Sequence, residues 1–389
     1  MSPPDALSFR SSQRQRVIEA MHQWLRDGTL APGGAVPSEM DIGARIGVSQ
    51  PTVQRALREL EASGLIRRVA GRRRVVAEPA PGTVANRTMT RTVAVGSPLL
   101  ESQAAQIHPG YDDARLVGVY RELRERQLHC FQFDPSVIPL DELAGLANSG
   151  IPAAIFPHGC EANSPILATA ERLRARGMAV VAYGDDPKLA NFDRVSSDHH
   201  AGGRLVVDWL LSRGRQNLIQ VGTRRPEPEP WAINRMAGMS DALAGSGRDW
   251  LAKISLPFFS PQAALVDWPD EALDFYVTYL IGHLAPLLRA GHRPDAMVLI
   301  TDGLIEPARL ACLALGLIPG GDVLIAGYDN YWTANYIREG KPSPPDVTVD
   351  RCNELCGREL CRLAHDRVGG LLSAQPAVRF IAPNVIVPN

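Results

Sequence analysis

The sequence is poor in several features that mark other classes of protein. It has three lysines in 389 residues, its six cysteines form no C-x-x-C pair, and no stretch approaches the roughly 18 to 20 apolar residues that span a bilayer. The first residues are polar and lack the apolar run of a signal peptide. These absences argue against a zinc site, a disulfide framework and a membrane anchor, and they predict a cytoplasmic protein.

Motifs of catalysis are missing as well. There is no G-x-S-x-G elbow, no G-x-x-x-x-G-K phosphate loop and no H-E-x-x-H metal helix. His199 and His200 follow Asp198, but no further cluster of acids and histidines accompanies them, so a metal site is not expected. With so few lysines, a fused pyridoxal phosphate enzyme is not expected either. We predict that the protein is not an enzyme and uses no cofactor.

The charge that is present is unevenly distributed. The net charge is −1, yet residues 1–91 contain 14 arginines against eight acidic residues, and the remainder of the chain is acidic. Hydrophobic residues make up 45% and charged residues 21% of the chain, as in ordinary globular proteins. The length exceeds that of one typical domain. We therefore expect at least two domains, the first of which binds a polyanion such as DNA.

The first part of the chain has the pattern of three short helices. Apolar residues recur at helical spacing over 14–25, and Ser38 with an acid three residues later can cap a second helix that runs to about residue 46. A turn that contains Gly47 leads to a third helix, which has an apolar stripe and ends near residue 64. Two short helices joined in this way form a helix-turn-helix, whose second helix can enter the DNA major groove.

Polar and basic side chains lie where such a domain would meet DNA. Opposite the apolar stripe of the third helix, the side chains can donate hydrogen bonds to base edges or phosphates. Residues 65–69 and 74–76 read as two strands around an arginine tip, which suits a wing on the phosphate backbone or in the minor groove. The alternative is a small helical domain with a solvated basic face.

These segments resemble the GntR family of winged-helix regulators over about residues 14–78. The resemblance rests on GTLAPGGAVPSE (28–39), IGVSQPTVQRAL (46–57) and LEASGLIR (60–67). Gln50 and Gln54 stand where the family commonly has arginines, which implies a different operator, because glutamine pairs well with adenine and arginine with guanine. The wing lacks the family's second glycine. The predicted DNA contacts are Ser38, Arg45, Ser49, Gln50, Thr52, Gln54, Arg55, Arg72 and Arg73.

A second domain begins at about residue 92, after a linker over 79–91 that is rich in proline, glycine and threonine. Short apolar segments alternate with helical ones, which predicts parallel sheets covered by helices on both faces, in two α/β lobes. Ligands of such sheets bind beyond the carboxyl ends of the strands. The strand-like segments are 93–96, 128–133, 153–156, 179–183, 218–221, 297–300 and 323–326, and the helical ones are 113–126, 140–148 and 165–176.

Residues 195–222, 235–243, 300–329 and 347–357 resemble the sugar-responsive domain of the LacI/GalR family, which shares its fold with periplasmic binding proteins. A GntR-type DNA-binding domain joined to a LacI-type ligand-binding domain is similar to the arrangement in arabinose repressors. The resemblance implies chain crossings between the lobes near 213–217, 345–350 and 372–377. It thus implies one lobe of residues 92–214 and 350–372 and another of 216–345 and 377–389.

The resemblance also implies ligand contacts by Arg235, Asp302 and Asp329. A carboxylate accepts hydrogen bonds from adjacent sugar hydroxyls and a guanidinium donates to them, while helix capping is the alternative for each aspartate. Thr301 stands where the family often has asparagine, so the contact there differs. Aromatic rings that stack on a sugar would complete the site, with core or rim positions as the alternative. The aromatic candidates are Tyr183, Phe192, Trp231, and Tyr331 or Trp332.

The sequence therefore predicts a winged helix followed by a two-lobed α/β domain, in a homodimer that binds a palindromic double-stranded DNA operator. The function that fits is a ligand-responsive transcriptional regulator, a repressor of carbohydrate-utilisation genes that a sugar or related polar ligand releases. Two alternatives remain open. One is a solute-binding protein, and the other is a regulator whose ligand cleft has degenerated.

Overall fold

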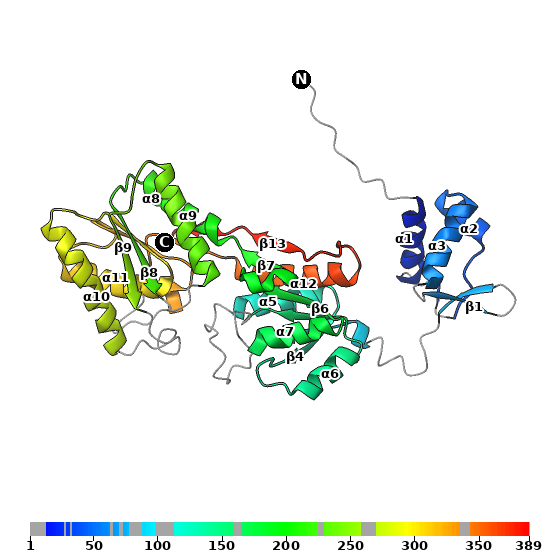
Figure 1. Cartoon of the computed structure of the whole chain (residues 1–389). Coiled ribbons are helices and arrows are strands. Elements are labelled where there is room, and N and C mark those ends of the chain that lie inside the picture. The colour runs from blue at the N-terminus through cyan, green and yellow to red at the C-terminus, as the bar shows by residue number, and fades with distance from the viewer. Residues whose placement is uncertain are drawn as a thin grey trace, which may run out of the picture. The chain divides into compact units, whose positions relative to one another are not determined.

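The computed structural model describes residues 13–26, 29–31, 33–62, 65–69, 73–77, 88–97, 113–158, 165–224, 229–257, 270–334 and 343–388. The chain divides into two compact units, Met1–Arg87 and Thr88–Asn389 (Figure 1). This division falls inside the segment expected to be a linker.

The first unit is a winged helix. Three helices are followed by an antiparallel hairpin, in the order predicted from the sequence. Apolar side chains from all five elements form one small core, which includes Met21, Ile42, Leu57, Ile66 and Val76. The elements are α1 (Gln13–Arg26), α2 (Glu39–Ile46), α3 (Gln50–Ala62), β1 (Ile66–Val69) and β2 (Arg73–Val76).

The ends of α2 follow the predicted capping chemistry. The Ser38 hydroxyl accepts a hydrogen bond from the Asp41 N–H, and the Asp41 carboxylate accepts one from the Ser38 N–H. Gly47 ends the helix with φ of 72°, a left-handed conformation that glycine adopts without steric cost. The capping box and the glycine turn therefore fix where α3 begins relative to α2.

Lobe 1 of the second unit is a parallel six-stranded sheet in the order β13-β7-β6-β5-β3-β4. Helices α5 and α12 cover one face and α6 and α7 the other, so both faces are buried. The strands are β3 (Thr92–Gly96), β4 (His129–Phe133), β5 (Ala153–Phe156), β6 (Ala179–Tyr183), β7 (Asp193–Ser197) and β13 (Val378–Ile381). The helices are α5 (Asp113–Glu125), α6 (Leu140–Asn148), α7 (Pro165–Ala175) and α12 (Asn353–Val368).

Lobe 2 is a parallel four-stranded sheet in the order β11-β10-β8-β9, with α8 and α9 on one face and α10 and α11 on the other. A short antiparallel pair, β12 (Thr348–Asp350) and β14 (Asn384–Ile386), adjoins it. No helix in the described ranges is long and apolar enough to cross a bilayer. The other elements are β8 (Leu218–Arg224), β9 (Ala252–Pro257), β10 (Ala296–Leu299), β11 (Leu324–Ala326), α8 (His199–Ser212), α9 (Pro230–Gly245), α10 (Asp270–Arg289) and α11 (Ile305–Ala314).

Two of the three predicted crossings between the lobes are wrong. Helix α8 packs in the core of lobe 2 through Val206 and Leu210, so the chain crosses at Asp198 and not at 213–217. Strand β13 pairs with β7 in lobe 1, so the last crossing lies at 382–383 and not at 372–377. The middle crossing, at 351–352, adjoins the predicted range. The family resemblance implied these positions, and it did not show which lobe α8 and β13 join.

Two pairs of helices approach so closely that only glycine fits between them. A Cβ atom on Gly203 of α8 or on Gly238 of α9 would overlap a backbone carbonyl oxygen of the facing helix. Gly118 of α5 and Gly357 of α12 have the same relation in lobe 1. Figure 1 shows α8 and α9 side by side, at the point where the chain enters lobe 2. Each lobe therefore has one tightly seated pair of helices.

The variant Gly238→Ala should lower the free energy of unfolding by about 1–3 kcal/mol, because α8 and α9 must move apart to admit a methyl group. The measurement is urea unfolding followed by tryptophan fluorescence. Gly245→Ala, at the end of the same helix, is the matched control, since nothing lies within 4 Å of its Cβ position. That control should be neutral or stabilise by up to about 1 kcal/mol. Equal effects of the two variants would contradict the close approach.

Candidate functional site

Helix α3 presents polar side chains on the face opposite its buried stripe. Gln50, Gln54 and Arg55 are exposed, as predicted for base or phosphate contacts. Thr52 is half-buried, and its hydroxyl lies 3.0 Å from the hydroxyl of the exposed Ser49. The structure thus brings these five residues onto one surface, and their contacts with DNA stay a prediction.

The other predicted DNA contacts are more varied in their surroundings. The Ser38 hydroxyl is occupied by the cap of α2, which gives it a structural role. Arg45 is exposed at the end of α2, with its guanidinium 5.6 Å from the centre of the Trp24 ring. Arg73 is exposed at the start of β2, and Arg72 lies outside the described residues.

An ion-pair network that the sequence did not reveal joins the wing to α2 and α3. Arg74 of β2 contacts Glu39 of α2 at 2.8 Å and Glu61 of α3 at 2.5 Å. Glu39 also accepts a hydrogen bond from Gln50 at 3.4 Å. These partners are 11 to 35 positions apart in the chain, so no local pattern indicates their pairing. The network holds the wing and α3 in one arrangement.

In lobe 2, a buried carboxylate lies between two arginines. Arg235 donates from both terminal nitrogens to Asp329, at 2.9 and 3.3 Å, and also to the carbonyl oxygen of Ile300. Arg351 Nε lies 3.1 Å from the same carboxylate, and the Thr301 hydroxyl donates to it at 2.9 Å. The structure thus brings together three predicted ligand residues, Arg235, Thr301 and Asp329. Arg351 was not predicted.

The members of this cluster come from separate elements. Arg235 is on α9, Asp329 follows β11 with φ of 99°, and Arg351 lies at the middle crossing. Burial alone would raise the pKa of Asp329, but the charges of Arg235 and Arg351 outweigh it and hold that pKa below its usual value. The Arg235 guanidinium is also stacked, 3.5 Å from the centre of the Tyr328 ring and 4.6 Å from that of Trp231. Asp329 is therefore ionised in the interior.

The two adjacent histidines have unrelated surroundings. His199 is buried, with Nδ1 3.4 Å from an Arg235 nitrogen, and burial followed by the charges of three nearby arginines lowers its pKa well below 6.5. His200 is more exposed and contacts Asp241 at 2.8 Å. No group of three or more potential metal ligands occurs among the described residues. His199 is thus a neutral member of the arginine cluster.

Asp302 is fully buried, and its carboxyl group forms hydrogen bonds with other residues of lobe 2. One oxygen accepts hydrogen bonds from the backbone N–H groups of Tyr331 and Trp332, at 2.8 and 3.2 Å, and the other accepts from the Thr348 hydroxyl at 2.8 Å. It caps neither helical segment beside it, contrary to the alternative considered from the sequence. These contacts hold the loop after β11, and a ligand contact of Asp302 stays a prediction.

The predicted aromatic residues differ in their positions. Tyr183 is half-buried at the carboxyl end of β6, with its ring 4.0 Å from the Arg115 guanidinium. The Tyr331 hydroxyl lies 2.7 Å from that of Thr301. Phe192 is 1% exposed in the core of lobe 1, so its assignment to the cleft is wrong. Trp332 packs against the core of lobe 2.

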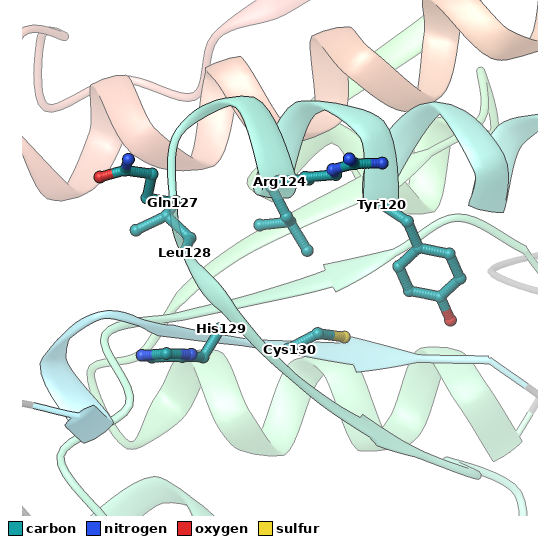
Figure 2. A pocket seen from close by; sticks show the side chains of 7 residues that line it. Tyr120, Arg124, Gln127, Leu128, His129 and Cys130 are labelled. Carbon is teal, nitrogen blue, oxygen red and sulfur yellow. The ribbon is translucent and has the colours of Figure 1, made fainter.

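A separate hollow of about 490 Å³ lies on lobe 1, between the end of α5 and the start of β4 (Figure 2). Tyr120 and Arg124 line it from the helix, and His129 and Cys130 from the strand. It lies at the amino end of β4, whereas parallel sheets bind ligands beyond their carboxyl ends. This hollow is therefore distinct from the predicted ligand site.

A winged helix followed by two parallel-sheet lobes defines a two-domain architecture with a periplasmic-binding-protein-like second unit. Residues 13–76 match the family model described as bacterial regulatory proteins, gntR family. The second unit has the fold of LacI-family proteins. The chain thus joins a winged helix that matches the gntR family model to a domain that has the LacI-family fold.

Three comparisons support this architecture. The HTH-type transcriptional regulator CelR of Thermobifida fusca is 26% identical over 191 residues, 48% of this chain and 50% of CelR. The chain thus spans about half the length of this curated relative. A solved complex of CelR with cellobiose matches 90% of this chain and 99% of that chain at 20% identity, with a TM-score of 0.54. A LacI-family regulatory protein from Chloroflexus aggregans matches 77% and 97% at 19% identity, with a TM-score of 0.58.

Asp302 should make the stability of the second unit depend on pH. Burial raises its pKa from 3.8 to about 8, so between these values the folded protein keeps a proton that the unfolded chain has lost. Its contribution to stability is present below pH 4 and is lost as the pH rises to about 8. In Asp302→Asn, which stays neutral, the free energy of unfolding should fall less steeply with pH than in the wild type. Urea unfolding from pH 5 to pH 8 measures this, and a constant difference between the two proteins would refute it.

Proposed function

We propose that the protein is a ligand-responsive transcriptional regulator, a repressor of carbohydrate-utilisation genes that leaves its operator when a sugar or related polar ligand binds. One observation carries the proposal: an exposed polar helix α3 is joined to a domain with a buried arginine–carboxylate cluster. The name of CelR, a transcriptional regulator, and its complex with cellobiose support it. The role is regulatory and not catalytic, and it is exerted in the cytoplasm, where bacterial DNA lies.

A homodimer would present two winged helices to a palindromic double-stranded operator. Two-fold symmetry in a protein is matched by two-fold symmetry in the half-sites, and their spacing is set by the distance between the recognition helices. Gln50 and Gln54 would read base edges, while Arg55 and Arg73 would contact phosphates. The winged helix sets the operator sequence, and the second unit sets the spacing.

Ligand binding would act through contacts at the junction of the lobes. Arg351 of the cluster lies at a chain crossing, and Asn234 of lobe 2 donates to Asp185 of lobe 1 at 2.8 Å. A ligand held by Arg235 and Asp329 would favour one arrangement of the lobes over another. Operator affinity then changes only by the ligand's preference between the two states.

A regulator with a degenerate cleft is the second candidate. Asp329 already has Arg235, Arg351 and Thr301 as partners, so this carboxylate needs no ligand to be hydrogen-bonded. A solute-binding protein is the third, and specific DNA binding by the full-length chain would exclude it.

The variant Gln54→Ala should relax the preference for one base pair in each half-site and cost about 1–3 kcal/mol of operator binding, since it removes a direct contact to a base. Binding to a library of operators mutated at single positions measures this. Arg58→Ala, on the same exposed face of α3, is the contrasting variant and should weaken all sequences alike. Uniform weakening by Gln54→Ala would instead assign Gln54 to a phosphate.

The variant Asp329→Asn should bind the operator but respond to ligand at least about tenfold more weakly, because it loses a charge-assisted hydrogen bond. A thermal-shift screen of monosaccharides, sugar acids, polyols and nucleosides finds the ligand, since a hundredfold excess over Kd adds about 2.7 kcal/mol of stability. Operator release by that compound is then titrated. Asp241→Asn, which removes an exposed carboxylate from α9, is the control. A normal response of Asp329→Asn would favour the degenerate cleft.

A further inference from the structure

Three arginines from distant parts of the second unit converge on one region. Arg235 is on α9, Arg351 is at the middle crossing, and Arg115 is in the first turn of α5. Arg115 is 5% exposed and donates to the carbonyl oxygen of Pro157, at the carboxyl end of β5, at 2.7 Å. Contacts link Arg115 to Arg351 through Tyr183, whose ring lies 4.0 Å from the Arg115 guanidinium and whose hydroxyl lies 3.2 Å from that of Ser197. The Ser197 hydroxyl in turn donates to the carbonyl oxygen of Arg351 at 3.0 Å. The region lies at the carboxyl ends of the lobe 1 strands, where the cleft is expected.

Among the described residues, little negative charge opposes these arginines. Asp329 is the ionised carboxylate that Arg235 and Arg351 share. Asp302 keeps its proton to about pH 8 and so carries little charge at neutral pH. The Asp198 carboxylate accepts from the Ala201 N–H in the first turn of α8, and the positive end of this helix offsets its charge. The charges that act most strongly on His199 are three arginines and one carboxylate.

One donor of the cluster lacks a partner. Arg235 Nε has no hydrogen-bond acceptor among the described residues, although the side chain is 1% exposed. A buried donor without an acceptor costs about 1–3 kcal/mol. The folded protein therefore keeps a buried guanidinium with one N–H group that an acceptor atom of a ligand can pair with.

We propose that the cleft binds an anionic ligand: a sugar or polyol that carries a carboxylate or a phosphate, held by Arg235, Arg351 and Arg115. This rests on the proposed function and names the class of its ligand. A guanidinium presents donors in a planar fork that matches two oxygens of such a group, and charge-assisted hydrogen bonds are roughly twice as strong as neutral ones. A neutral sugar would use the hydrogen-bond donors but would gain no charge–charge attraction to the arginines.

Matched sets of neutral and anionic sugars test, on the full-length protein, whether a negative charge on the ligand strengthens binding. Glucose, glucuronate and glucose 6-phosphate form one set, and galactose, galacturonate and galactose 6-phosphate another. Calorimetry should show at least tenfold tighter binding of an anionic member than of its neutral parent. That preference should shrink as sodium chloride is raised, because salt screens the attraction. The two anionic arms distinguish a carboxylate ligand from a phosphate ligand.

Paired variants locate the effect. Arg351→Gln removes one charge from the cluster and should weaken the preferred anionic compound at least about tenfold, with little change for its neutral parent. Arg358→Gln removes a charge from α12 where the arginine contacts Glu122 and Glu125 of α5, away from the cluster, and should change neither affinity. An equal loss in both variants would mean that general charge, and not this cluster, attracts the ligand.

Two outcomes would overturn the inference. One is binding of neutral parents as tight as that of their anionic partners, which would leave the regulatory function in place. The other is binding of none of the six compounds, nor of inorganic phosphate. Operator binding by the same protein preparation, measured without ligand, shows separately whether the proposed function stands.

Discussion

The carboxylate of Asp329, held between Arg235 and Arg351, connects three parts of the second unit. It joins α9, the loop after β11 and the crossing that leads into α12. Removing a carboxylate from water is costly, and only several close donors offset that cost. Breaking such a buried pair by deleting one partner typically costs about 3–5 kcal/mol. The position of each of these segments is therefore tied to that of the others.

The close seating of α8 against α9 places a neutral ring beside this charge cluster. Because Gly203 and Gly238 let the two backbones touch, His199 at the start of α8 comes within 3.4 Å of Arg235. The same pair of helices carries Trp231, whose ring lies on the guanidinium. Gly203 and Gly238, which have no side-chain functional groups, thus determine which side chains surround Arg235.

Much of the fold could be predicted from the sequence because its signals are local. The capping box at Ser38, the turn at Gly47 and the alternation of apolar strands with helices each depend on neighbouring residues. The crossings between the lobes were misplaced because the pairing of β13 with β7 joins residues about 180 positions apart.

The candidate site was predicted only in part, for the same reason. Arg235, Thr301 and Asp329 were named through a family resemblance, and they do converge. Arg351, Arg115 and Arg74 were missed, because an arginine in a helix or strand has the same local pattern whether it is solvated or buried. Phe192 was an aromatic candidate for the cleft with a core position as the alternative, and its ring fills the core of lobe 1.

The three crossings have a mechanical consequence. They lie at residues 198, 351–352 and 382–383, each only one or two residues long, and each connects rigid elements directly. Bodies linked by several short tethers lose most of their relative degrees of freedom, and what remains is rotation about an axis through the tethers. Arg351 lies on one of them, next to that axis. Rotation about such an axis displaces a residue beside it, such as Arg351, by the least distance and the far ends of the lobes by the greatest.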